Sequence, residues 1–116
     1  MTRQAAERRG RGAETLACWY LRLKGWRILA RRARVPGGEV DIVARRRQIL
    51  AFVEVKARAT EDAAAMALDD WRLRRVAVAA ERLAPRYMRS GDDLRIDAIY
   101  MVPRRWPKHL PNVWLG

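Results

Sequence analysis

Two β-rich runs, residues 39–44 and 49–57, are separated by only four polar residues, and this spacing constrains the fold more than any other feature. Valine, isoleucine and phenylalanine dominate the apolar positions of both runs, as is typical of strands. A connection this short joins neighbouring antiparallel strands, so we predict a β-hairpin. With Arg46-Arg47 or residues 45–48 as the turn, the register pairs Ala44 with Ile49, Asp41 with Phe52, and Glu39 with Glu54.

This hairpin is expected to collect charged side chains on one face. Side chains alternate along a strand, and residues paired across a ladder project to the same side. Carboxylates gathered on a covered face repel one another and lose hydration, and a divalent cation would offset both penalties. One face should carry Glu39, Asp41, Phe52, Glu54 and Lys56, and the other should carry Val40, Ile42, Ala51, Val53 and Val55.

The chemistry of these side chains favours a metal-assisted reaction. Mg²⁺ prefers oxygen ligands, and Asp41 and Glu54 would supply them. Lys56 beside the ion could orient or deprotonate a water, or neutralise charge on a phosphate. The alternative is a cross-strand salt-bridge cluster on a face that water reaches. Phosphodiester hydrolysis is the reaction class that uses these groups.

Glycine and proline divide the rest of the chain into helices and strands. Apolar residues recur at helical spacing in residues 5–24, and Gly25 ends that run. A second helical pattern covers residues 63–84 and stops before Pro85. Shorter patterns predict strands at residues 26–30 and 94–102 and near residues 113–115. The expected fold class is α/β, a mixed β-sheet flanked by helices in the order αβββαβ.

Length and charge narrow the function. A chain of 116 residues is expected to form one domain, residues 1–116. Its 25 Lys and Arg against 13 Asp and Glu give a net charge of +12, which suits a polyanionic partner. Cys18 and His109 are single, which excludes an intrachain disulfide and a two-histidine metal motif. No apolar stretch is long enough for a membrane span, and we expect a cytoplasmic protein.

At Asp41 and Glu54-Val55-Lys56 the sequence resembles the PD-(D/E)xK nuclease superfamily. Over nearly its full length it resembles the YraN-type family of endonuclease-like proteins, itself similar to archaeal Holliday junction resolvases. The resemblance runs from residues 10–14 through 38–41 and 52–58 to 95–97 and 109–113. It implies a restriction-endonuclease-like core. It also implies Mg²⁺ or Mn²⁺ held by Asp41, Glu54, Glu14 and the Val55 carbonyl, with Lys56 as the catalytic lysine.

Glu14 has two interpretations at the sequence level. Glu14, Cys18 and Leu21 form one line along the first predicted helix, so Glu14 could reach the sheet and join the metal site. A glutamate near a helix N-terminus is also favoured by the helix dipole alone.

Arginines provide the candidate contacts to nucleic acid. A stripe on the second predicted helix is either a solvated face or a track for phosphates, which arginine binds with a two-pronged fork. The arginine-rich hairpin turn either contacts phosphate or prevents edge pairing. Arg58 is expected closest to the scissile strand. The residues concerned are Arg58, Arg72, Arg75, Arg82, Arg45, Arg46 and Arg47.

The main hypothesis is a divalent-metal-dependent endonuclease acting on DNA, with branched or structured DNA as the favoured substrate. The alternative is a non-catalytic nucleic-acid-binding module that retains the nuclease fold. A third class is a scaffold whose basic surface binds RNA or an acidic protein. Resolvase-like activity would favour a homodimer, because cutting two strands symmetrically needs two sites.

Overall fold

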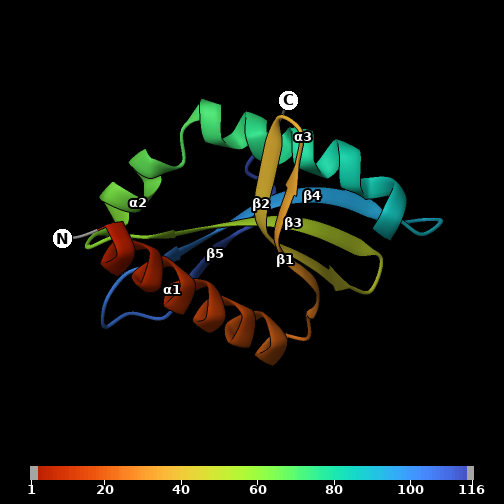
Figure 1. Cartoon of the computed structure of the whole chain (residues 1–116). Coiled ribbons are helices and arrows are strands. Elements are labelled where there is room, and N and C mark those ends of the chain that lie inside the picture. The colour runs from red at the N-terminus through yellow and green to blue at the C-terminus, as the bar shows by residue number, and fades with distance from the viewer. Residues whose placement is uncertain (1–2, 115–116) are drawn as a thin grey trace.

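A five-stranded mixed sheet lies between two layers of helices in the computed structural model, which describes residues 3–114 and the side chains of residues 10–114 (Figure 1). One long helix crosses one face of the sheet, and two helices cover the other face. In chain order the elements are α1 (Arg3–Leu23), β1 (Arg27–Val35), β2 (Gly38–Arg46), β3 (Ile49–Ala57), α2 (Glu61–Ala67), α3 (Asp70–Tyr87), β4 (Asp93–Met101) and β5 (Lys108–Leu110).

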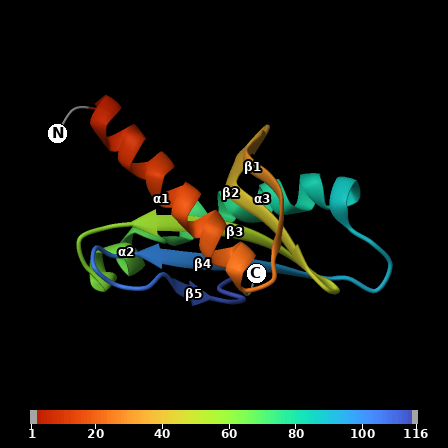
Figure 2. The same cartoon turned by 90° about the horizontal axis from the view of Figure 1, so that it is seen from below.

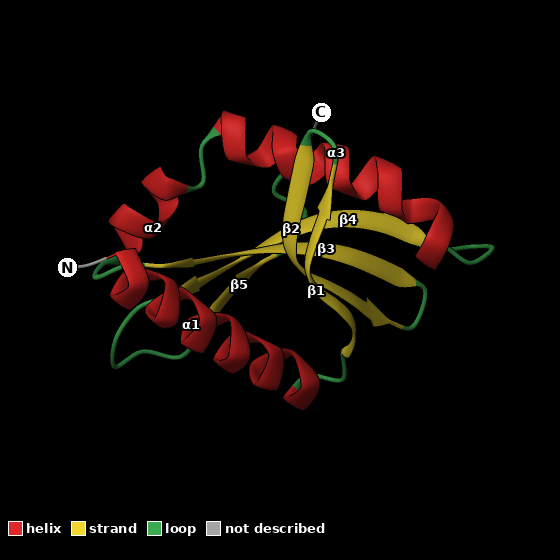
Figure 3. Ribbon diagram, viewed as in Figure 1, coloured by secondary structure: helices red, strands yellow, loops and turns green. Residues whose placement is uncertain are grey.

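The strands lie in sequence order across the sheet, β1-β2-β3-β4-β5 (Figure 3). All neighbours are antiparallel except β3 and β4, which are parallel. A parallel pair needs a crossover connection, and α2 with α3 supplies it. The predicted α/β class and mixed sheet are confirmed, and the arrangement is compatible with a restriction-endonuclease-like core.

Both faces of the central strands are buried, which makes the sheet a rigid platform. On the α1 face, Ala17 and Leu21 pack against Ile42 and Val53. On the α3 face, the core includes Val43, Phe52, Val76 and Ala80. Figure 2 shows α1 running obliquely across its side of the sheet. Side chains anchored on β2 and β3 are therefore held by packing on two sides.

The hairpin register differs from the prediction by two residues. Arg46 pairs with Ile49 and Ala44 with Ala51, so only Arg47 and Gln48 form the turn. Arg47 takes a left-handed conformation with φ of 54°, as a tight two-residue hairpin requires. An even shift leaves the side chains of the paired residues 42–46 and 49–53 on their predicted faces, and the error within this ladder is in the length of the turn.

The helical cover and the chain end also differ from expectation. The helix predicted over residues 63–84 is two helices, because Thr60 caps α2 and Asp69 caps α3 through side-chain bonds to backbone N–H groups. Pro85 lies inside the last turn of α3, where it removes only one helical hydrogen bond. The last strand is β5 rather than residues 113–115, of which residue 115 lies outside the described range.

Within residues 3–114, no helix is both long enough and apolar enough to cross a membrane.

Arg45 ties the hairpin to the end of α3 instead of contributing to an exposed basic turn. It is 7% exposed. Its two terminal nitrogens donate to the two carboxylate oxygens of Asp92 at 2.9 and 2.6 Å, and one also donates to the Tyr87 carbonyl at 2.7 Å. The guanidinium lowers the pKa of Asp92 to about 2. We therefore remove Arg45 from the expected nucleic-acid contacts.

Asp92→Asn is expected to lower the Tm by about 10 °C at neutral pH, because it leaves the buried Arg45 cation without its charge partner. Asp92 titrates near 3.8 when unfolded and about 2 when folded, so its contribution is complete above pH 3.8 and is lost as the pH falls through 2. The difference from wild type should shrink over that range in thermal melts. Asp93→Asn, at the exposed neighbouring residue, is the control, and equal losses in both variants would contradict the account.

Candidate active site

Asp41 lies where the regular pairing of β2 with β3 ends. The ladder runs from Arg46 and Ile49 to Ile42 and Val53. At the next step the Val55 N–H donates to the Asp41 carboxylate at 2.8 Å instead of to a backbone carbonyl. The side chain thus replaces one rung of the sheet, and this bond holds Asp41 against β3.

The pleat of β2 is broken at the same place. Val40 belongs to the α3-side core together with Val43, whereas Ile42 belongs to the α1-side core, so the predicted position of Val40 beside Ile42 is wrong. Gly38 explains how the hairpin end reaches α3. A Cβ there would lie 2.4 Å from the Arg75 carbonyl, so only glycine permits this close approach. The β1–β2 end rises toward α3 in Figure 1.

Glu54 and Lys56 form a buried ion pair on β3. Lys56 Nζ donates to Glu54 Oε2 at 3.0 Å. Lys56 is 8% exposed and Glu54 is 3% exposed. The second carboxylate oxygen, Glu54 Oε1, is buried and has no hydrogen-bond partner among the described residues. An unpartnered buried carboxylate oxygen is costly for stability alone, which makes Glu54 a candidate functional residue.

Asp41 and Glu54 are electrostatically coupled. Burial is the largest cause that raises the pKa of Asp41, and the neighbouring Glu54 carboxylate is the next; together they bring this pKa to about 8. The Val55 N–H and the Lys56 ammonium lower it and only partly compensate. Two carboxylates this close repel each other when both are ionised. A bound cation would reduce this repulsion.

Glu14 approaches this pair from α1. Burial and the charge of Asp41, in that order, raise the pKa of Glu14, while Arg32 lowers it. Arg32 Nε lies 3.3 Å from Glu14 Oε2. Glu14, Arg32 and Asp41 line one hollow, which α1, β1 and β2 enclose together with the start of α3. The structure thus brings three of the predicted acids, Glu14, Asp41 and Glu54, to one region.

Arg32 was missed at the sequence level. It stands between the paired positions Arg31–Ile42 and Ala33–Val40, opposite Asp41, with φ of 50°. The strand predicted for residues 26–30 stops before this residue, whereas β1 continues to Val35. A run rich in arginine gives a weak strand signal, because the apolar half of the alternation is nearly absent.

The donor set fits a hard divalent cation. Asp41, Glu54 and Glu14 offer carboxylate oxygens, and the unpartnered Glu54 oxygen can coordinate an ion without breaking a hydrogen bond. The described residues contain no group of three or more His, Cys, Asp or Glu already placed to hold a metal. Lys56 and Arg32 instead balance the charges of Glu54 and Glu14. Binding of an ion would therefore require these two cations to be displaced.

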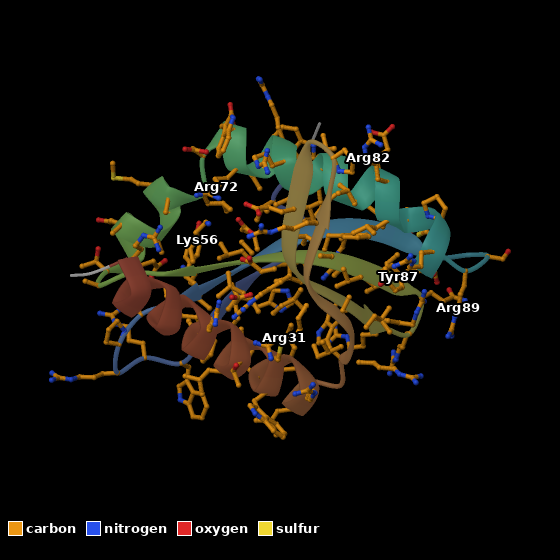
Figure 4. All side chains as sticks on the ribbon, viewed as in Figure 1. Arg31, Lys56, Arg72, Arg82, Tyr87 and Arg89 are labelled. Atoms are coloured by element: carbon orange, nitrogen blue, oxygen red, sulfur yellow. The ribbon has the colours of Figure 1, made fainter. Side chains whose placement is uncertain are left out.

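The arginines predicted to contact nucleic acid lie at different distances from this site. Arg72 lines the same hollow and lies 3.4 Å from Glu39. Figure 4 shows Arg72 and Lys56 on one side of the molecule and Arg82 toward the far end of α3. Arg75 stacks on Trp71, and Arg82 is exposed. The stripe thus runs from the site outward along α3.

The remaining arginines lie elsewhere. Arg58 is exposed just after β3. Arg46 donates to the Lys24 carbonyl at 3.2 Å and stacks on Trp26, which makes it mainly a packing residue. Arg47 is exposed at the hairpin turn.

A second buried carboxylate, Asp97, lies outside the predicted site. It is fully buried and accepts bonds from Arg95 and from the backbone N–H of Asn112, and it also bonds His109 at 2.8 Å. Asp97 pairs with Val53, which faces α1, so it lies on the opposite face of the sheet from Glu54. These bonds fix β5 and the chain after it. The sequence signals for this role are an aspartate in the middle of an apolar strand and the place of residues 95–97 and 109–113 in the family resemblance.

Fold and site together define an α/β protein with a carboxylate and lysine cluster at a break in a mixed sheet. The sequence model of the uncharacterised protein family UPF0102 matches residues 13–101. A UPF0102 protein of Sphingopyxis alaskensis is 59% identical over 114 residues, which cover 98% of each chain. UPF0102 proteins of Rhizorhabdus wittichii and Erythrobacter litoralis are 54% and 50% identical over 114 residues, covering 98% of this chain and 97% and 98% of theirs. The chain belongs to the UPF0102 family.

Replacing Asp41 by Asn is expected to stabilise the protein at pH 8. The pKa of Asp41 rises from 3.8 to about 8 on folding, so the stability that the protonated group contributes is present below pH 3.8 and is lost as the pH rises through 8. Asparagine keeps an acceptor for the Val55 N–H without the charge. The Tm of Asp41→Asn should exceed that of wild type by roughly 5 °C at pH 8 and match it near pH 4.

The matched control is Asp62→Asn on the exposed face of α2, which should follow wild type at every pH. A pH-independent difference between Asp41→Asn and wild type would show that Asp41 ionises normally in the folded protein.

Proposed function

We propose that this protein is a divalent-metal-dependent nuclease of the PD-(D/E)xK superfamily that hydrolyses phosphodiester bonds in DNA. The observation that carries the proposal is the cluster of half-buried Asp41 with buried Glu54 and Lys56, in which Glu54 Oε1 has no hydrogen-bond partner among the described residues. A stable fold gains nothing from two coupled carboxyl groups and a spare oxygen, whereas a cation site uses all of them.

In this proposal Asp41, Glu54, Glu14 and the Val55 carbonyl would hold Mg²⁺ or Mn²⁺. Such an ion would supply Lewis-acid polarisation of a phosphate oxygen and would lower the pKa of a water molecule, so that the water can lose a proton to solvent and then attack phosphorus. Asp41 must first lose the proton that its raised pKa retains at neutral pH. This requirement couples activity to pH, with activity rising toward pH 8.

Lys56 has two roles in this scheme. In the present arrangement its ammonium neutralises Glu54. Released from Glu54, it can donate a hydrogen bond to a non-bridging phosphate oxygen, where negative charge develops as water adds to phosphorus and the P–O bond breaks. Lys56 is 8% exposed and belongs to the buried strand β3. Its side chain is therefore already restricted, and little conformational freedom would be lost when it binds the phosphate.

The surrounding arginines would hold the polyanion. Arg72 lines the hollow with Asp41, and Arg58 follows β3 only two residues after Lys56. Arg75, Arg82 and Arg47 would extend the contact to more distant phosphates. With a net charge of +12, these contacts predict binding that weakens steeply with salt.

The second candidate function is a non-catalytic nucleic-acid-binding module. It is favoured by the two ion pairs that occupy the proposed ligands, Lys56 with Glu54 and Arg32 with Glu14. If these pairs are never released, the protein binds nucleic acid through its arginines without turnover. Titration with Mn²⁺ separates the two functions, because only the nuclease responds to it.

Incubation with labelled single-stranded, duplex and four-way-junction DNA in Mn²⁺ is expected to yield cleavage products. Asp41→Ala should abolish cleavage, and Lys56→Met should slow it by about a hundredfold or more through loss of transition-state stabilisation. Asp62→Ala serves as the control and should cleave like wild type. No cleavage of any substrate, or equal rates in Asp41→Ala and wild type, would contradict the nuclease proposal.

A further inference from the structure

A seam between α1 and residues 102–107 is separate from the candidate active site. Two hollows follow one another along it. Leu16 and Arg58 border the first, together with the loop from Val102 to Arg105. Tyr20, Leu23, Lys24 and Trp106 line the second. In Figure 1 the blue loop between β4 and β5 passes beside α1.

The seam exposes an unusual amount of apolar and aromatic surface. Trp106 is 84% exposed, Leu23 is 80% exposed and Leu16 is 60% exposed. Trp19 and Tyr20 on the same helix are each covered by a cation, Arg22 and Lys24 respectively. Among the described residues no such cation covers Trp106. A group of exposed apolar and aromatic side chains of this kind is typical of a ligand-binding surface.

The positive charge around the seam favours an anionic partner. Arg58, Arg104, Arg105 and Lys24 are exposed and line the two hollows. No acidic residue among the described side chains lines either hollow. Glu61, which is paired with Lys108, and the exposed Asp62 lie in an adjoining hollow that shares Arg105. Two copies of this surface would repel each other, and so would a basic partner. A ligand with apolar faces and regularly spaced negative charges matches it, and unpaired nucleic acid has both.

We propose that this seam binds an unpaired stretch of nucleic acid, with a base stacked on Trp106 and phosphates held by Lys24, Arg104, Arg105 and Arg58. Duplex DNA hides its base faces and cannot stack on Trp106. The seam therefore distinguishes strands that are frayed, gapped or branched from regular duplex. As a statement about substrate choice this rests on the proposed nuclease function, while the binding itself does not.

The position of α1 connects the seam to the active site. Gly10 and Glu14 line the hollow that contains Asp41, whereas Gly12, Ala13 and Leu16 line the seam. A Cβ at Gly10 or Gly12 would meet nothing within 4 Å, so the surface of α1 is open on both sides. Arg58 on the seam and Lys56 in the site belong to one stretch of chain. An unpaired strand held in the seam would keep the adjoining junction close to Asp41.

The test measures binding without catalysis. Fluorescence anisotropy in EDTA compares a labelled oligothymidylate of about 15 nucleotides with a blunt duplex of the same length. Trp106→Ala is expected to weaken oligothymidylate binding about tenfold and to leave duplex binding within about twofold. Trp106→Phe should restore most of the affinity, because an aromatic face remains. Arg105→Ala should weaken oligothymidylate binding and lower its salt dependence.

Arg89→Ala is the charge-matched control, since Arg89 is exposed at the opposite end of the molecule (Figure 4). An unchanged affinity in Trp106→Ala, or an equal loss for duplex and single strand, would overturn the proposal. Self-association of the wild type that Trp106→Ala abolishes, measured by sedimentation equilibrium, would assign the seam to a second copy and overturn it as well.

The same variants separate this proposal from the nuclease proposal. Asp41→Ala should bind oligothymidylate like wild type. If wild type cleaves no DNA but the Trp106 effect is present, only the nuclease proposal fails. If cleavage depends on Asp41 but Trp106→Ala binds single strands normally, only the seam proposal fails.

Discussion

The hydrogen bond from the Val55 N–H to the Asp41 carboxylate determines much of the rest of the structure. It substitutes for a rung of the sheet where β2 leaves β3, and it brings Asp41 next to Glu54. Where β2 leaves β3 but stays paired with β1, Val40 packs on the α3 side, and Gly38 allows the close contact with α3. The same break leaves room for Glu14 to approach from the opposite face.

In a chain with a net charge of +12, several partly or fully buried acids form ion pairs with neighbouring basic side chains. Arg45 pairs with Asp92, Arg95 and His109 with Asp97, Lys56 with Glu54, and Arg32 with Glu14. The first two pairs fasten elements together, and their acids have a lowered pKa. The last two surround Asp41, whose pKa is raised. Asp41 and Glu14, whose pKa values are raised, are the acids that a bound cation would stabilise in the proposed site.

The hairpin and the shared face of Glu54 and Lys56 on β3 could be predicted because strand alternation is robust to an even shift in register. The turn length could not be predicted, because Arg47 adopts a conformation that arginine rarely signals. Nor could the strand break, since it depends on a side chain replacing a backbone acceptor across 14 positions. Arg32 and Asp97 were overlooked for a similar reason. Their partners, Glu14 and His109, lie 18 and 12 residues away, and only the tertiary fold brings them together.

We propose, as the central claim, that Asp41 and Glu54 form a cation site in which Asp41 stays protonated until an ion binds. Isothermal titration calorimetry with Mn²⁺ at pH 7, in two buffers of different ionisation enthalpy, counts bound ions and released protons in one experiment. The account predicts one Mn²⁺ per chain and the release of close to one proton in the wild type, with both lost in Asp41→Asn. Absence of Mn²⁺ binding, or binding without proton release, would contradict it.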